Sequence, residues 1–225
     1  MIKKYSLGIL FTTFFLVFHL VYGKEIIQYF LVSNIPKDSS FFISRIPFWL
    51  IVLFIFTYAR KVEGGSISLW KEQIYPLTFY LKKIPYLYLI TLGAAALINL
   101  ILQAIINENL SGKLINTTLL FKDSYFLLVF TCLTAGVTEE LMMRGYIQTR
   151  LEKIYSSRWV GIIASSLLFG IMHITYGTYK QLIGTTIIGL FLAYNYHRKR
   201  SLLLVIIVHF LIDFITLNVI YLNNL

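Results

Sequence analysis

Seven long apolar runs constrain this chain more than any other feature of its sequence. They cover roughly residues 6–22, 46–59, 84–106, 124–147, 159–176, 181–196 and 202–222. A helix needs about 20 predominantly apolar residues to cross a bilayer. The second and sixth runs are short, and the second reaches spanning length only if it includes residues 41–44, in which case Arg45 must reach the interface or face protein. We predict an all-α, polytopic transmembrane bundle of about seven spanning helices, with a range of six to eight.

Composition supports this class. The chain is 58% hydrophobic and 13% charged, whereas soluble domains are usually nearer half apolar and a quarter charged. No internal repeat, low-complexity tract or linker divides it, so we expect residues 1–225 to form a single membrane domain. The single cysteine, Cys132, excludes an internal disulfide and any metal site built from several cysteines.

The net charge of +10 indicates topology rather than nucleic-acid binding, because the basic residues are scattered between apolar runs. Alternate segments differ in Lys and Arg content by about twofold, and such an excess marks the cytoplasmic side. The richer set is Lys3, Lys4, Arg60, Lys61, Lys71, Lys82, Lys83, Arg150, Lys153, Arg158, Arg198, Lys199 and Arg200. We therefore predict a multi-pass cell-membrane protein, in contact with the lipid bilayer, with a cytoplasmic N-terminus and an external C-terminus.

Two further expectations concern the first run and the second loop. The start "MIKK" resembles a secretory signal, but "VYGKEIIQYF" after the run offers no small-residue cleavage site, which favours an uncleaved first span. We also expect an interfacial amphipathic helix within residues 60–83.

Ionisable residues inside predicted spans are costly, and each is by default a functional hypothesis. They are His19, Glu139, Glu140, Arg144, His173, His209 and Asp213. Glu140 and Arg144 are four residues apart, so they share a helix face and can neutralise each other. His209 and Asp213 have the same spacing. Glu139 is turned about 100° from Glu140 around the helix axis, so both acids cannot face Arg144.

Simpler interpretations compete with a functional one. An ion pair can merely close a helix end, and a lone histidine usually bonds a neighbouring helix, the role we assign to His19. Three groups of small residues predict close helix packing: Gly93–Ala96; Gly161, Ala164, Ser165 and Ser166; and Gly184 with Gly189. Three polar clusters on three separate spans are nevertheless expensive for packing alone. The depth of a residue in the membrane can be estimated by counting about 1.5 Å per residue from the start of its predicted helix. By this count Glu139 and His173 lie about three turns apart in depth, so the sequence allows the three clusters to meet but does not require it.

If the clusters meet, a carboxylate and an imidazole in a dry pocket can deprotonate and orient water, the first step of amide hydrolysis. A second imidazole could stabilise the oxyanion that follows. The set Glu139, His173, His209 and Asp213 could also hold a divalent metal such as zinc. The H-E-x-x-H signature is absent, so a metal is left open. No G-x-S-x-G, Gly-rich phosphate loop or paired-Cys motif occurs.

Three motifs occur in order within the apolar C-terminal part, over about Gly136–Phe214: "EELMMR", "FGIMH" and "HFLID". They have the forms E-E-x-x-x-R, F-x-x-x-H and H-x-x-x-(N/D). Together they resemble the signature of the CAAX protease and bacteriocin-processing family of intramembrane peptidases, also called the Abi family. The family-like catalytic core would cover about residues 124–222.

The resemblance implies a role for each matching residue. Glu139 would be the general base that activates water with His173. Glu140, Arg144 and Phe169 would give structural support. His209 with Asp213 would bind the oxyanion or help hold a metal. The eukaryotic CAAX endopeptidases carry Asn at the last position, and Asp213 cannot donate a hydrogen bond unless it is protonated. Asp213 would then orient His209 or join a metal shell.

The leading hypothesis is an intramembrane endopeptidase, of glutamate type or metal-dependent, that cleaves a membrane-associated protein or peptide. Family roles include trimming prenylated C-termini and processing bacteriocin leaders. A composition of bacterial character favours a peptide or membrane-anchored protein over a prenylated one. The alternative is a non-catalytic bacteriocin-immunity or scaffold protein of the same family. An ion-coupled transporter is a third class, although the paired repeats and broken helices typical of transporters are not evident.

Overall fold

The described residues of the computed structural model are 1–30, 36–109, 111–122 and 124–223, and they form helices and connecting segments without a strand. The predicted all-α class is confirmed. Three short elements have non-α geometry, η1 and η2 being π-helical and η3 a 3₁₀ turn. In chain order the elements are α1 (Ile2–Phe30), α2 (Lys37–Ile43), α3 (Ile46–Tyr58), η1 (Ala59–Glu63), α4 (Leu77–Ile106), α5 (Gly112–Leu119), α6 (Tyr125–Glu140), η2 (Leu141–Gln148), α7 (Thr149–Tyr155), α8 (Arg158–Met172), η3 (His173–Tyr176), α9 (Tyr179–Lys199) and α10 (Leu202–Asn223).

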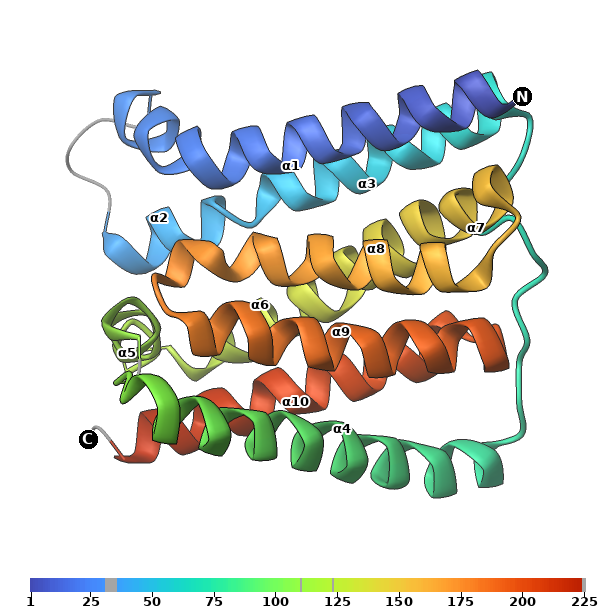
Figure 1. Cartoon of the computed structure of the whole chain (residues 1–225). Coiled ribbons are helices and arrows are strands. Elements are labelled where there is room, and N and C mark those ends of the chain that lie inside the picture. Colours follow the sequence, from blue (N-terminus) through green and yellow to red (C-terminus); the bar gives the residue numbers. More distant parts are fainter. Residues whose placement is uncertain (31–35, 110, 123, 224–225) are drawn as a thin grey trace.

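Six helical segments of the described chain are long and apolar enough to cross a membrane, so this is a multi-pass membrane protein. Their number lies within the predicted range of six to eight. They are Ile2–Gly23, Ser39–Glu63, Leu77–Ile106, Tyr125–Tyr155, Arg158–Tyr176 and Leu202–Asn223. The second span begins at Ser39, so the short second run does include the residues before Arg45 and reaches spanning length. α9 corresponds to the short sixth run and is not among the six, although it lies alongside α8 and packs on α4 (Figure 1).

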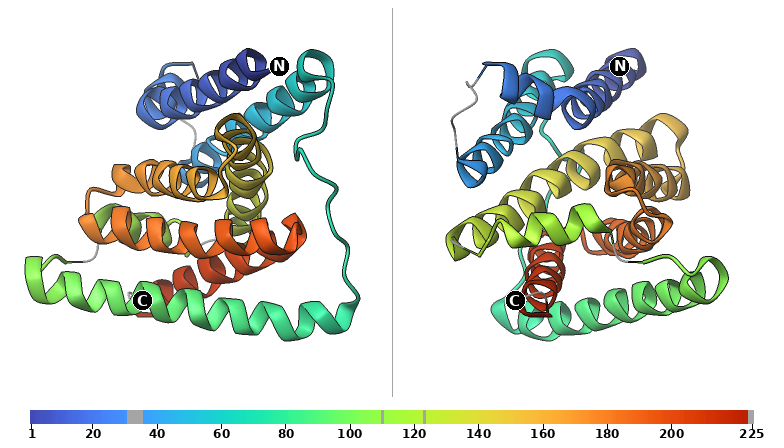
Figure 2. Two further views of the ribbon diagram at one scale, coloured as in Figure 1. Left: turned by 45° about the vertical axis from the view of Figure 1, so that its right-hand side comes forward. Right: turned by 90° about the vertical axis from the view of Figure 1, so that its left-hand side faces the viewer.

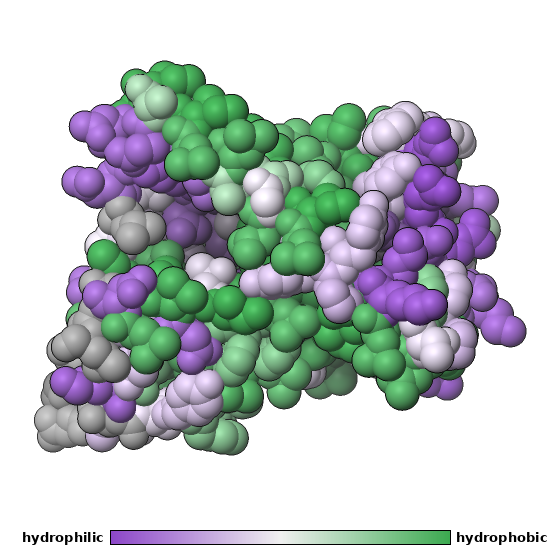
Figure 3. Space-filling view, turned by 90° about the horizontal axis from the view of Figure 1, so that it is seen from below, coloured by the Kyte–Doolittle hydropathy of each residue, from purple (hydrophilic) through white to green (hydrophobic). Residues whose placement is uncertain are grey.

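The long helices lie side by side and run between two ends of the molecule, with the N-terminus at one end and the C-terminus at the other (Figures 1 and 2). Seen from below, a hydrophobic surface covers the middle and hydrophilic residues gather toward both ends (Figure 3). This is the surface expected of a bundle whose middle faces lipid.

The N-terminus, residues 60–76, α7 and the end of α9 meet at one end, which we call the basic end. Lys4 Nζ donates to Val62 O over 2.8 Å, and Arg150 forms a 2.6 Å ion pair with Glu63. Gln73 N donates to the carbonyl of Arg200 over 2.7 Å. The segments predicted to share the cytoplasmic side thus lie together.

The amphipathic helix expected within residues 60–83 is wrong for residues 64–76, which are irregular. Side-chain bonds hold this segment against the basic end instead. Glu72 accepts from the Tyr196 hydroxyl over 2.6 Å and from Leu202 N over 2.7 Å. The guanidinium of Arg150 donates to carbonyls of Ser66 and Ile67.

Small residues let α8 approach its neighbours closely, as predicted for Gly161 and Gly189. A Cβ at Gly161 would lie 2.8 Å from Gln148 O, and one at Gly189 would lie 3.3 Å from Phe169. Gly170, in α8, is equally close to a backbone: a Cβ there would lie 2.8 Å from Leu182 O of α9. The packing role predicted for Gly93 is wrong, because a Cβ there would meet nothing within 4 Å.

Gly170 and Gly93 give a matched test of the α8–α9 contact. We expect Gly170→Ala to lower the free energy of unfolding by about 1–3 kcal/mol, because the backbone at Leu182 must move. Gly93→Ala, the control, should leave it unchanged or raise it by about 0.5–1 kcal/mol through helix propensity. Reversible unfolding in mixed micelles measures both. Equal effects of the two substitutions would contradict the close packing.

Candidate active site

Phe169 brings the three polar clusters together. Its ring lies 5.0 Å from the His173 ring and 5.4 Å from the His209 ring, measured between centroids. The Arg144 guanidinium lies 4.5 Å above the same ring. Residues from α6–η2, α8 and α10 therefore meet around one aromatic side chain.

A close contact between α6 and α10 sets the position of the acid pair. Gly136 lies one turn before Glu140, and a Cβ at Gly136 would lie 3.2 Å from both Ile206 O and Phe210 N of α10. The glycine lets the two backbones approach. The carboxylate of Glu140 can then reach His209.

Glu140 is the centre of a buried charge network. Its Oε2 lies 3.2 Å from Arg144 Nε, an ion pair whose alignment falls short of a hydrogen bond. Its Oε1 lies 2.9 Å from His209 Nδ1. Arg144 also donates to the carbonyl of Gly189 over 3.2 Å, which ties α9 to the network. The side chains of Glu140 and Arg144 are fully buried.

His209 has a carboxylate at each ring nitrogen. Nδ1 faces Glu140, and Nε2 lies 3.4 Å from Asp213 Oδ2. The imidazole can donate at both positions only when both nitrogens carry protons. Asp213 is the more open partner, with 32% of its side chain exposed.

Glu139 forms no hydrogen bond with this network through its buried Oε2. The residue is only 9% exposed, yet its Oε2 has no hydrogen-bond partner. Its carboxylate lies within electrostatic range of His173, His209 and Asp213. Two adjacent acids thus have different surroundings, as their rotation around the helix predicts: Glu140 is paired, and Glu139 is not.

His173 sits where α8 ends and the 3₁₀ turn η3 begins. Its Nδ1 lies 2.9 Å from Phe169 O. A carbonyl only accepts, so this bond places a proton on Nδ1 and leaves Nε2 with a free lone pair in the neutral ring. The side chain is partly buried, and its ring stacks at 6.0 Å on that of Tyr176.

Two residues near the site were missed by the motifs: Arg45 and Tyr176. Arg45 lies between α2 and α3, and its guanidinium lies 4.3 Å above the Phe41 ring and 5.6 Å above the Phe48 ring. It interacts electrostatically with Tyr176 and Glu139. The position of Arg45 inside an apolar run is the sequence signal that could have indicated it, whereas Tyr176 carries no comparable signal.

The arrangement does not fit a zinc shell. Within the described residues, no group of three or more His, Cys, Asp or Glu side chains is placed to hold a metal ion. Zinc binds a histidine through a free ring nitrogen. Both nitrogens of His209 already face carboxylates, so this residue would have to release one of them.

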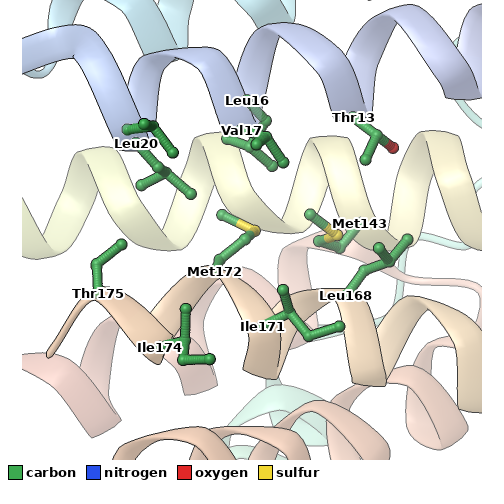
Figure 4. A pocket seen from close by; sticks show the side chains of 11 residues that line it. Thr13, Leu16, Val17, Leu20, Met143, Leu168, Ile171, Met172, Ile174 and Thr175 are labelled. Atoms are coloured by element: carbon green, nitrogen blue, oxygen red, sulfur yellow. The ribbon is translucent and has the colours of Figure 1, made fainter. Parts of the chain in front are cut away.

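An apolar pocket of about 110 Å³ lies beside the site, between α1, η2, α8 and η3 (Figure 4). Leu16 and Val17 of α1, Met143 of η2 and Met172 of α8 are among its lining residues. Met172 and Ile174, the two chain neighbours of His173, both line the pocket, whereas His173 itself is not among the lining residues.

Residues 121–215 match a protein-family model described as "Type II CAAX prenyl endopeptidase Rce1-like". The matched range includes all seven residues of the three motifs, so the resemblance derived from them is confirmed. The first three candidate spans lie outside the range. Comparisons with curated proteins and with solved structures found no match.

The charge network predicts unequal effects of removing its two charges. Glu140→Leu leaves Arg144 without its counter-ion and should lower the free energy of unfolding by about 3–5 kcal/mol. Arg144→Met should cost less, because Glu140 keeps His209 as a partner. Glu25→Leu on the exposed surface of α1 is the control, expected within about 0.5 kcal/mol of the parent protein. Reversible unfolding in micelles measures the set, and a larger loss for Arg144→Met would contradict the network.

Proposed function

Residues 121–215 form an Rce1-like type II CAAX prenyl endopeptidase domain, and from this premise we propose that the protein is an intramembrane endopeptidase. It hydrolyses a peptide bond of a membrane-associated protein or peptide with water activated by Glu139 and His173. One observation carries the proposal: Glu139 is a buried carboxylate with an unpartnered oxygen, within electrostatic range of imidazoles on two neighbouring helices.

In this mechanism Glu139 and His173 act as a pair. A water molecule binds between the free oxygen of Glu139 and Nε2 of His173, and Glu139 takes a proton as the water oxygen attacks the carbonyl carbon. The tetrahedral intermediate then collapses, the C–N bond breaks, and Glu139 returns the proton to the leaving amine. The bond from His173 Nδ1 to Phe169 O favours the tautomer that this requires.

The remaining motif residues act as positioning residues. Glu140 and Arg144 fix the turn that carries Glu139, and Phe169 separates the two imidazoles at a set distance. His209 ties α10 to Glu140, and Asp213 orients His209 through Nε2. Because Glu140 is already neutralised, Glu139 is the acid free to exchange a proton.

The substrate class follows from the surroundings of the site. The apolar pocket lined by Met172 and Ile174 adjoins α1 and offers hydrocarbon surface rather than hydrogen-bonding groups (Figure 4). Such surface suits apolar side chains or a lipid chain next to the scissile bond. A membrane-embedded peptide or a membrane-anchored protein would approach from within the bilayer.

The orientation is part of the same proposal. Most Lys and Arg residues between the spans belong to the basic end, and such residues concentrate on the cytoplasmic side of membrane proteins. We place the N-terminus and the basic end in the cytoplasm and the C-terminus outside.

Replacing the proposed base tests the mechanism directly. Glu139→Gln keeps the shape of the side chain but cannot accept the proton, so we expect cleavage to fall below detection with normal expression and membrane insertion. Mass spectrometry of peptide termini in membranes of cells with parent or variant protein measures this. Glu152→Gln at the basic end is the control and should retain cleavage. If Glu139→Gln keeps full processing, the mechanism is wrong, and an unchanged cellular phenotype would favour the non-catalytic immunity or scaffold role.

Metal removal tests the glutamate-type chemistry. Since His209 has no free ring nitrogen for a metal, we expect cleavage by the reconstituted protein to be unchanged after treatment with 1,10-phenanthroline. Elemental analysis of the same preparation accompanies the assay. Loss of activity that zinc restores would contradict this part of the proposal.

A further inference from the structure

The reaction proposed above leaves one charge without a partner. When water adds to the scissile carbonyl, its oxygen becomes negative, and stabilisation of this oxyanion is often the largest single contribution to the rate. His209 can offer at most one donor to it, because Nδ1 is bonded to Glu140 and only Nε2, 3.4 Å from Asp213 Oδ2, is left. Arg144 also has two buried nitrogens without a hydrogen-bond partner, Nε and Nη1. Its charge is already neutralised by Glu140, however, and its guanidinium donates to the Gly189 carbonyl and lies on the face of Phe169.

Arg45 is differently placed. Its Nε is buried and has no hydrogen-bond partner among the described residues. The rings of Phe41 and Phe48 flank its guanidinium without offering an acceptor. A buried donor without an acceptor is costly, and native proteins usually keep one only where a ligand or water completes it.

The neighbours of Arg45 belong to the candidate site. Glu139 and Tyr176 lie within its electrostatic range, as does His19 of α1. The free oxygen of Glu139 and the free Nε of Arg45 are both unsatisfied, so the two groups do not bond each other. Both groups would be satisfied by a water molecule that donates to Glu139 and attacks a carbonyl whose oxygen accepts from Arg45.

We propose that Arg45 donates to the oxygen of the scissile carbonyl and stabilises the oxyanion. The inference rests on the proposed function. As the water oxygen bonds to the carbonyl carbon, its proton passes to Glu139 and the carbonyl π-electron pair moves onto the oxygen facing Arg45. When the C–N bond breaks, that pair re-forms the carbonyl and the proton of Glu139 goes to the amine. Arg45 lies outside residues 121–215, so the catalytic centre would need the N-terminal spans.

The test uses the full chain in proteoliposomes and a pooled library of internally quenched apolar peptides, followed by kinetics on the best-cleaved member. We expect Arg45→Met to lower kcat by roughly 100- to 1000-fold, the usual loss for one oxyanion donor. KM should change by less than about threefold, because the contact forms only in the transition state. Arg45→Lys should retain more kcat than Arg45→Met. The exposed Arg158→Met is the matched control and should keep both constants.

A second readout is binding of a transition-state mimic. A peptidyl phosphonate of the same sequence carries a tetrahedral P–O⁻ group at the scissile position, and Arg45→Met should weaken its inhibition by the same factor as kcat/KM. The proposal is overturned if Arg45→Met keeps kcat within about threefold of the parent, or if the loss lies in KM alone. Collapse of both Arg45 variants on size-exclusion would also overturn it. Glu139→Gln, measured in parallel, distinguishes failure of the Arg45 proposal from failure of the proposed function. If Glu139→Gln retains activity, the proposed mechanism itself is wrong.

Discussion

The structure of the site depends on one buried charge network in an otherwise apolar bundle. Glu140, Arg144 and His209 are almost completely excluded from solvent, and buried charges in proteins are usually paired with one another. The network draws on α6, η2 and α10 directly and on α9 through the Gly189 carbonyl, with the Phe169 ring of α8 beneath Arg144. Five helical elements are thereby held in fixed relative positions, and the position of Glu139 follows from this arrangement.

The two adjacent acids show how one helix can provide both support and chemistry. The two oxygens of Glu140 face His209 and Arg144, whereas Oε2 of Glu139 has no partner. If both acids were paired, the site would have no general base. If both were unpaired, Arg144 would be a buried charge without a counter-ion. In our proposals the N-terminal part of the chain completes the site with Arg45, which enters from the junction of α2 and α3. The helices before the family-like domain would then contribute to catalysis as well as to packing.

Much of the fold could be predicted from the sequence, because the lengths of the apolar runs and the positions of ionisable residues within them can be read directly from the sequence. Spacing alone predicted that Glu140 meets Arg144 and that Glu139 faces elsewhere. The convergence of the three helices could not be predicted, because depths estimated from a rise of about 1.5 Å per residue placed Glu139 and His173 at different levels in the membrane. The structure brings them within electrostatic range, with η2 continuing α6 and η3 ending α8. The bond from Glu140 to His209, the role of Gly170 and the open surroundings of Gly93 are tertiary facts, and no local pattern contains them.

The most direct measurement of the central claim is an electron cryomicroscopy map of the protein in lipid nanodiscs, at a resolution that shows ordered water. The account predicts one water molecule within about 2.6–3.2 Å of both Glu139 Oε2 and His173 Nε2. A map in which Glu139 is bonded directly to another side chain, with His173 directed into separate surroundings, would contradict it.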